Sequence, residues 1–281
     1  MISVKNLKFS YTNRPFIEGM SFEVGDGEIF GFLGPSGAGK STLQKILTGL
    51  LTDYRGSVIV NGVEVKNRDG SFYENIGVDF EFPSLYEKLT ARENLRFFAS
   101  LYKRSLDADE LLKSVGLLND ADKRVSDFSK GMKSRLNFIK ALIHDPKLLF
   151  LDEPTSGLDP SNARQMKDII LRQKAMGKTI LLTTHNMYDA TELCDRVAFI
   201  VDGSLRALDT PRGLIMAKGA SMIRYTYFQD GKERQREVEL SRTGEDELLQ
   251  RLLKENRLLS IHSSEPTLND VFVEITGRRL Q

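Results

Sequence analysis

The sequence predicts an α/β protein with a core of alternating strands and helices, an antiparallel β subdomain, an inserted helical subdomain and a small C-terminal α/β accessory domain. Three observations predict this fold. A glycine-rich stretch at residues 34–42 stands between a buried strand, residues 28–33, and a helix with an apolar face. A second buried strand, residues 147–151, runs directly into two carboxylates. Between these strands, residues 84–145 change to a helical pattern.

The glycine-rich stretch fits G-x-x-x-x-G-K-[ST], the pattern of a phosphate-binding loop (P-loop). Glycine lets backbone N–H groups crowd around phosphate oxygens, and the helix that follows adds the positive end of its dipole. Lys40 would reach the β and γ phosphates, and Ser41 would offer its hydroxyl to Mg²⁺. A glycine-rich turn can match by chance, but strand, loop and helix follow in the required order. We therefore expect a nucleotide site in a P-loop NTPase core, contacted by Gly34, Pro35, Ser36, Gly37, Ala38, Gly39, Lys40, Ser41 and Thr42.

Composition narrows the classes of protein further. The 281 residues include 40 Lys and Arg against 39 Asp and Glu, a net charge of +1, so nucleic acid is not an expected partner. One cysteine, Cys194, excludes an internal disulfide and suits a reducing cytosol. We expect no signal peptide, and no apolar run approaches the ~18 residues of a membrane span. If the protein acts at a membrane, another chain supplies the spans.

The first strands carry turn signals between them. Loosely alternating apolar residues predict strands at residues 2–9 and 22–24. Residues 57–60 and 63–65 flank Asn61-Gly62, a pair that favours a type I′ turn, and so predict a hairpin. One more strand is expected at residues 76–80.

Four side chains are candidates for the chemistry at the nucleotide. Asp152 and Glu153 stand at the C-terminal end of a central strand, where ligands of open α/β sheets bind. Asp152 would hold Mg²⁺ through water, and Glu153 would act on the attacking water as general base. His185 ends another buried strand at the same edge, which favours contact with the γ-phosphate over a structural role. Tyr11 precedes the P-loop, where its ring is either an ordinary edge aromatic or a platform for adenine.

The helical block, residues 84–145, has cap signals at its helix starts. Thr90 and Glu93 form a capping box, Asp107 and Glu110 repeat the spacing, and Ser129 can cap a third helix. Three helices between strands of an α/β core predict a helical subdomain.

Beyond the paired acids, Asp159-Pro160 begins a helix that runs towards Gly177. A strand, residues 179–184, and a hairpin turning at Asp202-Gly203 follow, with a short helix from Pro211. We place a boundary between residues 219 and 220. Residues 220–281 are expected to hold a small two-stranded unit, a helix at about 245–255, a strand at 258–262 and a last helix at 267–275 that stops at Gly277. The charged run 232–237 is read as a solvated face.

Residues 1–217 resemble the ATP-binding cassette (ABC) family of transporter ATPases. Residues 153–160, E-P-T-S-G-L-D-P, match the family's acid and D-loop stretch, and residues 128–132, F-S-K-G-M, stand where the family carries its signature L-S-G-G-Q. His185 occupies the switch-histidine position and Tyr11 the adenine-stacking position. Residues 265–272 resemble the C-terminal helix of cassettes in bacterial drug, antibiotic and lipid exporters.

The resemblance implies an ATPase subunit that uses ATP and Mg²⁺ and drives export through a separate integral membrane permease. Two cassettes would pair head to tail, each P-loop facing Ser129, Gly131 and Asp159 of the other copy. The chain would be cytoplasmic and peripheral at the inner face of the membrane, with the permease docked near residues 81–88. A soluble cassette protein of translation or DNA repair and a catalytically silent regulatory clamp are the alternatives. The sequence contains no N-K-x-D stretch of the kind that recognises guanine, so a GTPase is not supported.

Two departures from the family pattern affect the site. Lys130 and Met132 replace a glycine and a glutamine of the signature, so altered nucleotide affinity is expected. Glu81 stands where the family places a glutamine that ligates Mg²⁺ and senses the membrane partner. A carboxylate can also ligate Mg²⁺, so Glu81 is assigned to the metal with Ser41 and Asp152.

Overall fold

A computed structural model describes residues 1–80, 84–218, 222–264 and 266–277. Its contacts divide the chain into two units, residues 1–209 and a second unit that begins at Thr210. The second unit therefore includes the short helix α8 (Pro211–Lys218), which lies before the boundary expected at 219–220. The position at which the chain can be cut without unfolding the first unit remains a prediction. No helix among the described residues is long and apolar enough to cross a membrane.

The first unit is built on a six-stranded sheet. Within the described residues its order is β10-β9-β3-β8-β7-β6, parallel from β9 to β6 and antiparallel between β10 and β9. The strands are β3 (Ile29–Leu33), β6 (Ile76–Asp79), β7 (Leu148–Asp152), β8 (Thr179–Thr184), β9 (Arg196–Val201) and β10 (Ser204–Asp209). Every residue of β3, β7 and β8 is buried, as is typical of a parallel sheet covered on both faces.

The register of this sheet brings the predicted site together. Leu33, the last residue before the glycine-rich loop, pairs with Thr184, the last residue before His185. Asp152, the last residue of β7, pairs with Thr183, which precedes Thr184 on β8. Because these strands are parallel, their C-terminal ends meet at one edge, so the P-loop, the acids and His185 share that edge.

A four-stranded antiparallel sheet of order β2-β1-β4-β5 makes up the expected β subdomain. Its strands are β1 (Ile2–Phe9), β2 (Ile17–Val24), β4 (Arg55–Val60) and β5 (Val63–Glu64), so β2 starts earlier than the sequence predicts. Asn61 and Gly62 have φ values of 52° and 79°, which confirms the type I′ turn. Both sheets share one hydrophobic core, in which the ring of Phe22 lies 5.1 Å from that of Phe32.

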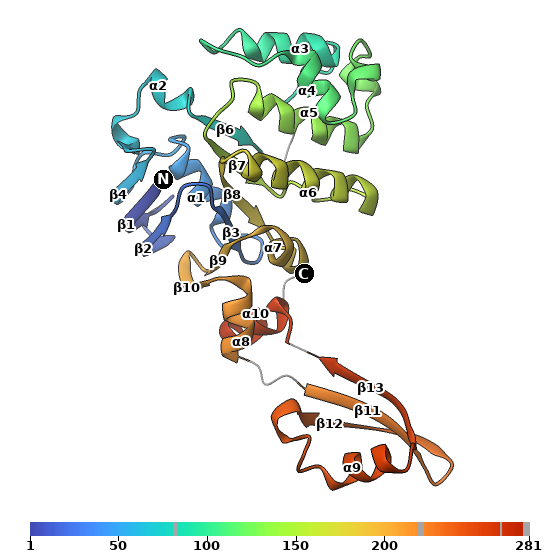
Figure 1. Cartoon of the computed structure of the whole chain (residues 1–281). Coiled ribbons are helices and arrows are strands. Elements are labelled where there is room, and N and C mark those ends of the chain that lie inside the picture. Colours follow the sequence, from blue (N-terminus) through green and yellow to red (C-terminus); the bar gives the residue numbers. More distant parts are fainter. Residues whose placement is uncertain (81–83, 219–221, 265, 278–281) are drawn as a thin grey trace. The chain divides into compact units, whose positions relative to one another are not determined.

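Helices cover the larger sheet and form the inserted subdomain. They are α1 (Lys40–Leu47), α2 (Gly70–Tyr73), α3 (Ala91–Ala99), α4 (Ala108–Ser114), α5 (Lys130–Leu142), α6 (Pro160–Ala175) and α7 (Met187–Leu193). Figure 1 shows α3, α4 and α5 grouped at the end of the unit away from β1 and β2, as the helical subdomain. The capping box of Thr90 and Glu93 is present, and Ser129 and Asp159 cap α5 and α6 as predicted.

The packing of α7 on β3 leaves no room for a side chain at Gly31. A Cβ built on Gly31 would lie 2.6 Å from Sγ of Cys194, the residue that follows α7. Cys194 is buried, and burial raises the pKa of its thiol far above the ordinary value. The lone cysteine is therefore a small apolar packing residue.

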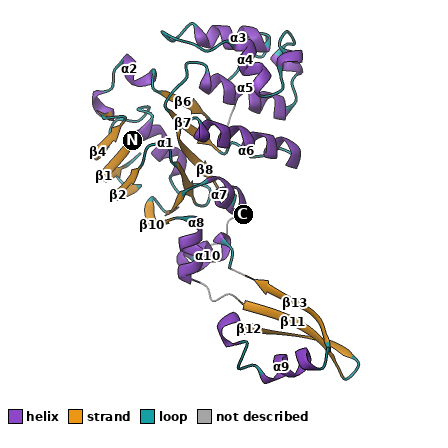
Figure 2. Ribbon diagram, in the orientation of Figure 1, coloured by secondary structure: helices purple, strands orange, loops and turns teal. Residues whose placement is uncertain are grey.

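The second unit holds a three-stranded antiparallel sheet, where the sequence predicts two paired strands (Figure 2). Its elements after α8 are β11 (Met222–Gln229), β12 (Lys232–Glu239), α9 (Glu247–Lys254), β13 (Leu258–Ser264) and α10 (Leu268–Thr276). The third strand, predicted as an isolated segment, pairs with β11. The charged run 232–237 is exposed as expected, but on strand β12. Tyr225 packs on Leu249 and Leu252, and its hydroxyl donates to Asp246 Oδ2 at 3.0 Å.

Candidate functional site

The loop between β3 and α1 has the backbone that a phosphate cradle needs. Gly37 and Gly39 have φ values of 78° and 110°, in the left-handed region that favours glycine. A Cβ on Gly34 would lie 2.1 Å from the carbonyl oxygen of Ile200. Lys40 Nζ donates to the carbonyl oxygens of Gly34 and Pro35 at 2.7 and 3.1 Å. The ammonium is thus held against the loop that would surround the phosphates.

Asp152 joins this loop to the central strands. Ser41 Oγ donates to Asp152 Oδ2 at 3.3 Å, and the hydroxyl of Thr183 donates to Asp152 Oδ1. Only 8% of Asp152 is exposed. The described residues contain no cluster of three or more acidic, His or Cys side chains that could hold a metal. Magnesium usually binds one or two protein oxygens plus phosphates and water, so the Ser41–Asp152 pair fits that ion.

Glu153 and His185 are in direct contact. His185 Nδ1 lies 2.8 Å from Glu153 Oε1, and Thr184 Oγ1 donates to Glu153 Oε2 at 3.2 Å. The Glu153 side chain is 10% exposed, whereas that of His185 is 47% exposed. Both carboxylate oxygens therefore have a fixed partner, and the imidazole keeps an open side. This is the arrangement that a positioned base and a phosphate-sensing histidine require.

Tyr11 lies beside the P-loop helix. Its hydroxyl is 3.0 Å from Thr42 Oγ1, and its ring meets those of Phe9 and Phe16 edge-on at centroid distances of 4.8 and 5.6 Å. The residue is still 57% exposed. An aromatic ring that is anchored on its edges and open on its surface can accept a planar base.

A cavity of about 290 Å³ lies between the ends of β6 and β7 and the start of α5. Asp79, at the end of β6, is 5% exposed and accepts a hydrogen bond from Asn137 on α5. Burial raises the pKa of Asp79 to about 7, and the nearby Asp152 carboxylate adds to this rise. Glu81, assigned to the metal from the sequence, follows in the chain but lies outside the described residues.

The start of α5 contacts its own chain. Ser129 is exposed, and its hydroxyl accepts a hydrogen bond from Met132 N at 3.2 Å. A Cβ on Gly131 would lie 2.9 Å from Asn162 on α6, so close packing within the chain already requires glycine there. Lys130 reaches over Gly157, where a built Cβ would lie 1.9 Å from its Nζ. Lys130 therefore covers the loop after β7 in this chain.

Asp159 has a clear structural role. Its Oδ1 accepts hydrogen bonds from the backbone N–H groups of Ser161 and Asn162 at 3.1 Å each, which caps α6. The hydrogen bond from the Asn162 side chain, followed by these backbone bonds, lowers the pKa of Asp159. The hydrogen bonds described here for Ser129 and Asp159 are local and do not include the P-loop.

Comparison with known proteins identifies the family. Residues 17–156 match the family model described as ABC transporter. The chain is 52% identical over 284 residues to the fluoroquinolones export ATP-binding protein of Mycobacterium tuberculosis (strain CDC 1551 / Oshkosh). The matched region covers 100% of this chain and 94% of that protein. The Nod factor export ATP-binding protein I of Rhizobium meliloti (strain 1021) is 39% identical over 298 residues, covering 100% and 89%. This chain belongs to the ABC transporter family.

Structure comparison agrees with this assignment. A solved structure of an ATP binding subunit of an ABC transporter matches with a TM-score of 0.70 and 32% identity, covering 77% of this chain and 92% of that one. The predicted ABC fold and the predicted activity are therefore confirmed: this cassette is an ATP-binding and ATP-hydrolysing subunit of an ABC transporter that powers export. The soluble and regulatory alternatives have no support among these relatives.

Several side chains that shape the cassette's site are not predicted from the sequence. Asp79 ends a strand at the same sheet edge as Asp152, so the strand-end rule applied to Asp152 would also have found it. Thr183 and Thr184, which hold the two acids, are hidden inside a run that predicts only a buried strand. Helix α7 is also missed, although Asn186 at its start is a strong N-cap residue.

Proposed function

We propose that this cassette hydrolyses ATP as a head-to-tail homodimer on the cytoplasmic face of a membrane, with Glu153 as the general base. The observation that carries the proposal is the contact between Glu153 and His185, 2.8 Å apart, next to the Ser41–Asp152 pair. Asp152, Glu153 and His185 lie at the ends of β7 and β8, and Ser41 lies in the first turn of α1 after β3; the parallel register brings the ends of these three strands to one edge.

The side chains divide the work at the γ-phosphate. Glu153 would accept the proton of the attacking water, and His185, whose Nδ1 faces Glu153, would turn Nε2 towards the γ-phosphate. Lys40 would exchange its two loop carbonyls for phosphate oxygens. Ser41 and Asp152 would hold Mg²⁺, which when bound neutralises charge on the phosphate oxygens. The ring of Tyr11 would stack on adenine.

For the dimer we propose that the exposed start of α5 serves the nucleotide bound by the second copy. Ser129 is an exposed N-cap at the start of α5, with backbone N–H groups behind it that suit an anion. We assign Ser129, Gly131 and Asp159 to the nucleotide of the second copy. Each of the two sites would then combine a P-loop from one chain with Ser129 from the other.

Mixing two inactive variants tests the head-to-tail arrangement. In a dimer of one Lys40→Ala chain and one Ser129→Ala chain, one site carries both changes and the other is intact. An equimolar mixture should therefore recover about a quarter of the unmodified ATPase rate, because half of the dimers are mixed and each has one working site. A mixture no more active than its components would contradict this arrangement.

Mg²⁺ and the membrane partner can be tested separately. Chelation with EDTA should abolish hydrolysis and added Mg²⁺ should restore it.

For the permease we propose an aromatic surface made by Tyr86, Phe97, Phe98 and Leu101. Tyr86, Phe97 and Leu101 are 48%, 41% and 63% exposed, and the rings of Tyr86 and Phe97 lie 4.9 Å apart. An exposed apolar group of this kind marks a protein contact. Tyr86→Ser should reduce co-purification with membranes and leave the ATPase rate of the free cassette unchanged.

For the transported class we propose a drug-like organic molecule, on the support of the relative named for fluoroquinolone export. Cells that express the cassette with its permease should tolerate higher norfloxacin than cells with the Lys40→Ala cassette. Equal tolerance would direct the search to other substrates.

A further inference from the structure

Glu153 has a strained backbone. Its φ is +51°, in the left-handed region that non-glycine residues rarely adopt. Such a conformation persists only where its surroundings hold it, and it often occurs at functional sites. Two backbone hydrogen bonds frame it: Glu153 N donates to Thr183 O, and Ser156 N donates to Glu153 O, both at 3.0 Å. The turn that follows Glu153 thus decides where its carboxylate points.

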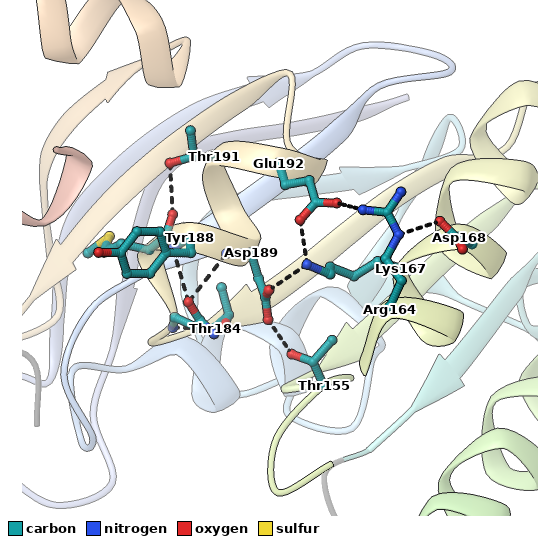
Figure 3. A network of polar contacts seen from close by, with 11 residues as sticks. Thr155, Arg164, Lys167, Asp168, Thr184, Tyr188, Asp189, Thr191 and Glu192 are labelled. Carbon is teal, nitrogen blue, oxygen red and sulfur yellow. Dashed lines mark hydrogen bonds and ion pairs between the residues drawn. The ribbon is translucent and has the colours of Figure 1, made fainter. Parts of the chain in front are cut away.

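A side-chain contact attaches this turn to α7. Thr155 Oγ1 donates to Asp189 Oδ2 at 2.6 Å (Figure 3). Thr155 lies in the turn after Glu153. Asp189 lies in the first turn of α7, the helix that begins at Met187 after His185 and Asn186. Asn186 Oδ1 accepts from Asp189 N at 3.3 Å, which fixes this end of the helix. One hydrogen bond therefore joins the segment after the base to the segment after the histidine.

Lys167 on α6 completes the contact. Its ammonium lies 3.3 Å from Asp189 Oδ1, in a pair whose side chains are only 15% and 10% exposed, and it also pairs with Glu192 (Figure 3). The bond to Glu192, with further help from the Asp189 charge, raises the pKa of Lys167, so the ammonium stays charged. Arg164 pairs with Glu192 at 3.0 Å and with Asp168 at 3.2 Å on the outside. This partly buried ion pair holds the Asp189 carboxylate in place, with its Oδ2 aimed at Thr155.

We propose that Thr155, Asp189 and Lys167 position the hydrolytic pair, holding the turn after Glu153 against α7 so that Glu153 and His185 keep their contact. The proposal rests on the role of Glu153 as base given above. Thr155, Asp189 and Lys167 are positioning residues, because the contacts described for them are with one another, with Asn186 and with Glu192.

Matched variants separate this role from general stability. Thr155→Val keeps the shape of the side chain and removes its donor. Without this donor the turn after Glu153 loses its side-chain attachment to α7, so kcat should fall about 10- to 100-fold, which corresponds to about 1.4–2.7 kcal/mol at 1.36 kcal/mol per tenfold change in rate. The KM for ATP should change less than about twofold, since the P-loop is untouched. Thr155→Ser keeps the hydroxyl and should restore kcat.

The control is Glu192→Gln. Glu192 lies on the same helix as Asp189 and pairs with the same Lys167 and with Arg164, whereas the hydroxyl of Thr155 donates to Asp189. Its kcat should stay within about twofold of the unmodified value. Asp189→Asn replaces one of the two carboxylate oxygens, which meet Thr155 and Lys167, with an NH2 group, so at least one of these contacts is lost. It should therefore lower kcat in the same direction as Thr155→Val. The double variant should be no slower than the slower single, because both changes act on one connected set of contacts.

The proposal is overturned if Thr155→Val and Asp189→Asn hydrolyse ATP at the unmodified rate, or if Glu192→Gln loses as much as they do. If Thr155→Val does not fold, Asp189→Asn and Thr155→Ser decide by the same comparison of kcat with KM. Failure of the base assignment looks different. In that case Glu153→Gln keeps its full rate, whatever the Thr155 variants do.

Discussion

Replacing Asp79 with Asn should stabilise the folded cassette, and more at pH 8 than at pH 5. Asp79 is 5% exposed and accepts a hydrogen bond from Asn137. Burial raises its pKa from 3.8 to about 7, although the charge of Lys140 and the bond from Asn137 oppose the rise. An Asn side chain has nearly the same shape, keeps an oxygen acceptor for Asn137, and carries no charge to bury.

The size and sign follow from proton linkage. Because the folded-state pKa lies above the unfolded value of 3.8, the folded protein keeps a proton that the unfolded chain loses as the pH rises. The stability due to this group is complete below about pH 4 and is lost as the pH rises through about 7. At 1.36 kcal/mol for each pKa unit, the full loss is about 4 kcal/mol, and somewhat more than a third of it has occurred by pH 5. The variant should therefore gain about 2 to 3 kcal/mol more at pH 8 than at pH 5.

Urea unfolding followed by circular dichroism at both pH values measures this difference. Asp53→Asn, which removes an exposed acid from the same unit, is the control and should show no such pH dependence. A variant at position 79 that is less stable than the natural chain at pH 8, or that gains equally at both pH values, would show that Asp79 is charged and compensated in the folded protein.

Four further changes test the site and the domain boundary. Lys40→Ala should weaken ATP binding about 10- to 100-fold through loss of a charge-assisted hydrogen bond, measured with a fluorescent ATP analogue; unchanged affinity would place the nucleotide elsewhere. Glu153→Gln should still bind ATP but hydrolyse it at least about 100-fold more slowly, with the dimer trapped on size exclusion in Mg-ATP; a normal rate would mean another base. Glu81→Gln should need more free Mg²⁺ for half-maximal ATPase and bind ATP better in EDTA, because a carboxylate that attracts metal and repels phosphate is gone; superimposed titrations would show that Glu81 does not face the metal. A chain ending at residue 219 should keep a folded circular dichroism spectrum and bind ATP; an insoluble product would move the boundary.

Local signals explain what the sequence predicts well. The Thr90 capping box, the Ser129 and Asp159 caps and the turn at Asn61-Gly62 each depend on a few adjacent residues, and the structure confirms all of them. The motif order also predicts that the P-loop and the acids meet, because the C-terminal ends of parallel strands share one edge.

The rest depends on contacts between distant segments. Asn137 meets Asp79 from 58 residues away, and Thr155 meets Asp189 across 34. The pairing of β13 with β11 gives the second unit a third strand that an isolated apolar segment does not reveal. The same limit applies to Gly131. Its absent side chain fits phosphate approach, yet the structure shows that Asn162 already fills the space.

The buried Cys194 makes the natural chain ready for site-directed chemistry. Its thiol lies against Gly31 with a strongly raised pKa, so at neutral pH it should not react with maleimides. A cysteine introduced at an exposed position would then be the sole reactive thiol, without any prior change to the protein. Ser36→Cys and Ser129→Cys chains, both altered at exposed positions, could be mixed and joined by a short bis-maleimide. The distance between the two halves of the proposed dimer would thereby become a measurable cross-linking yield.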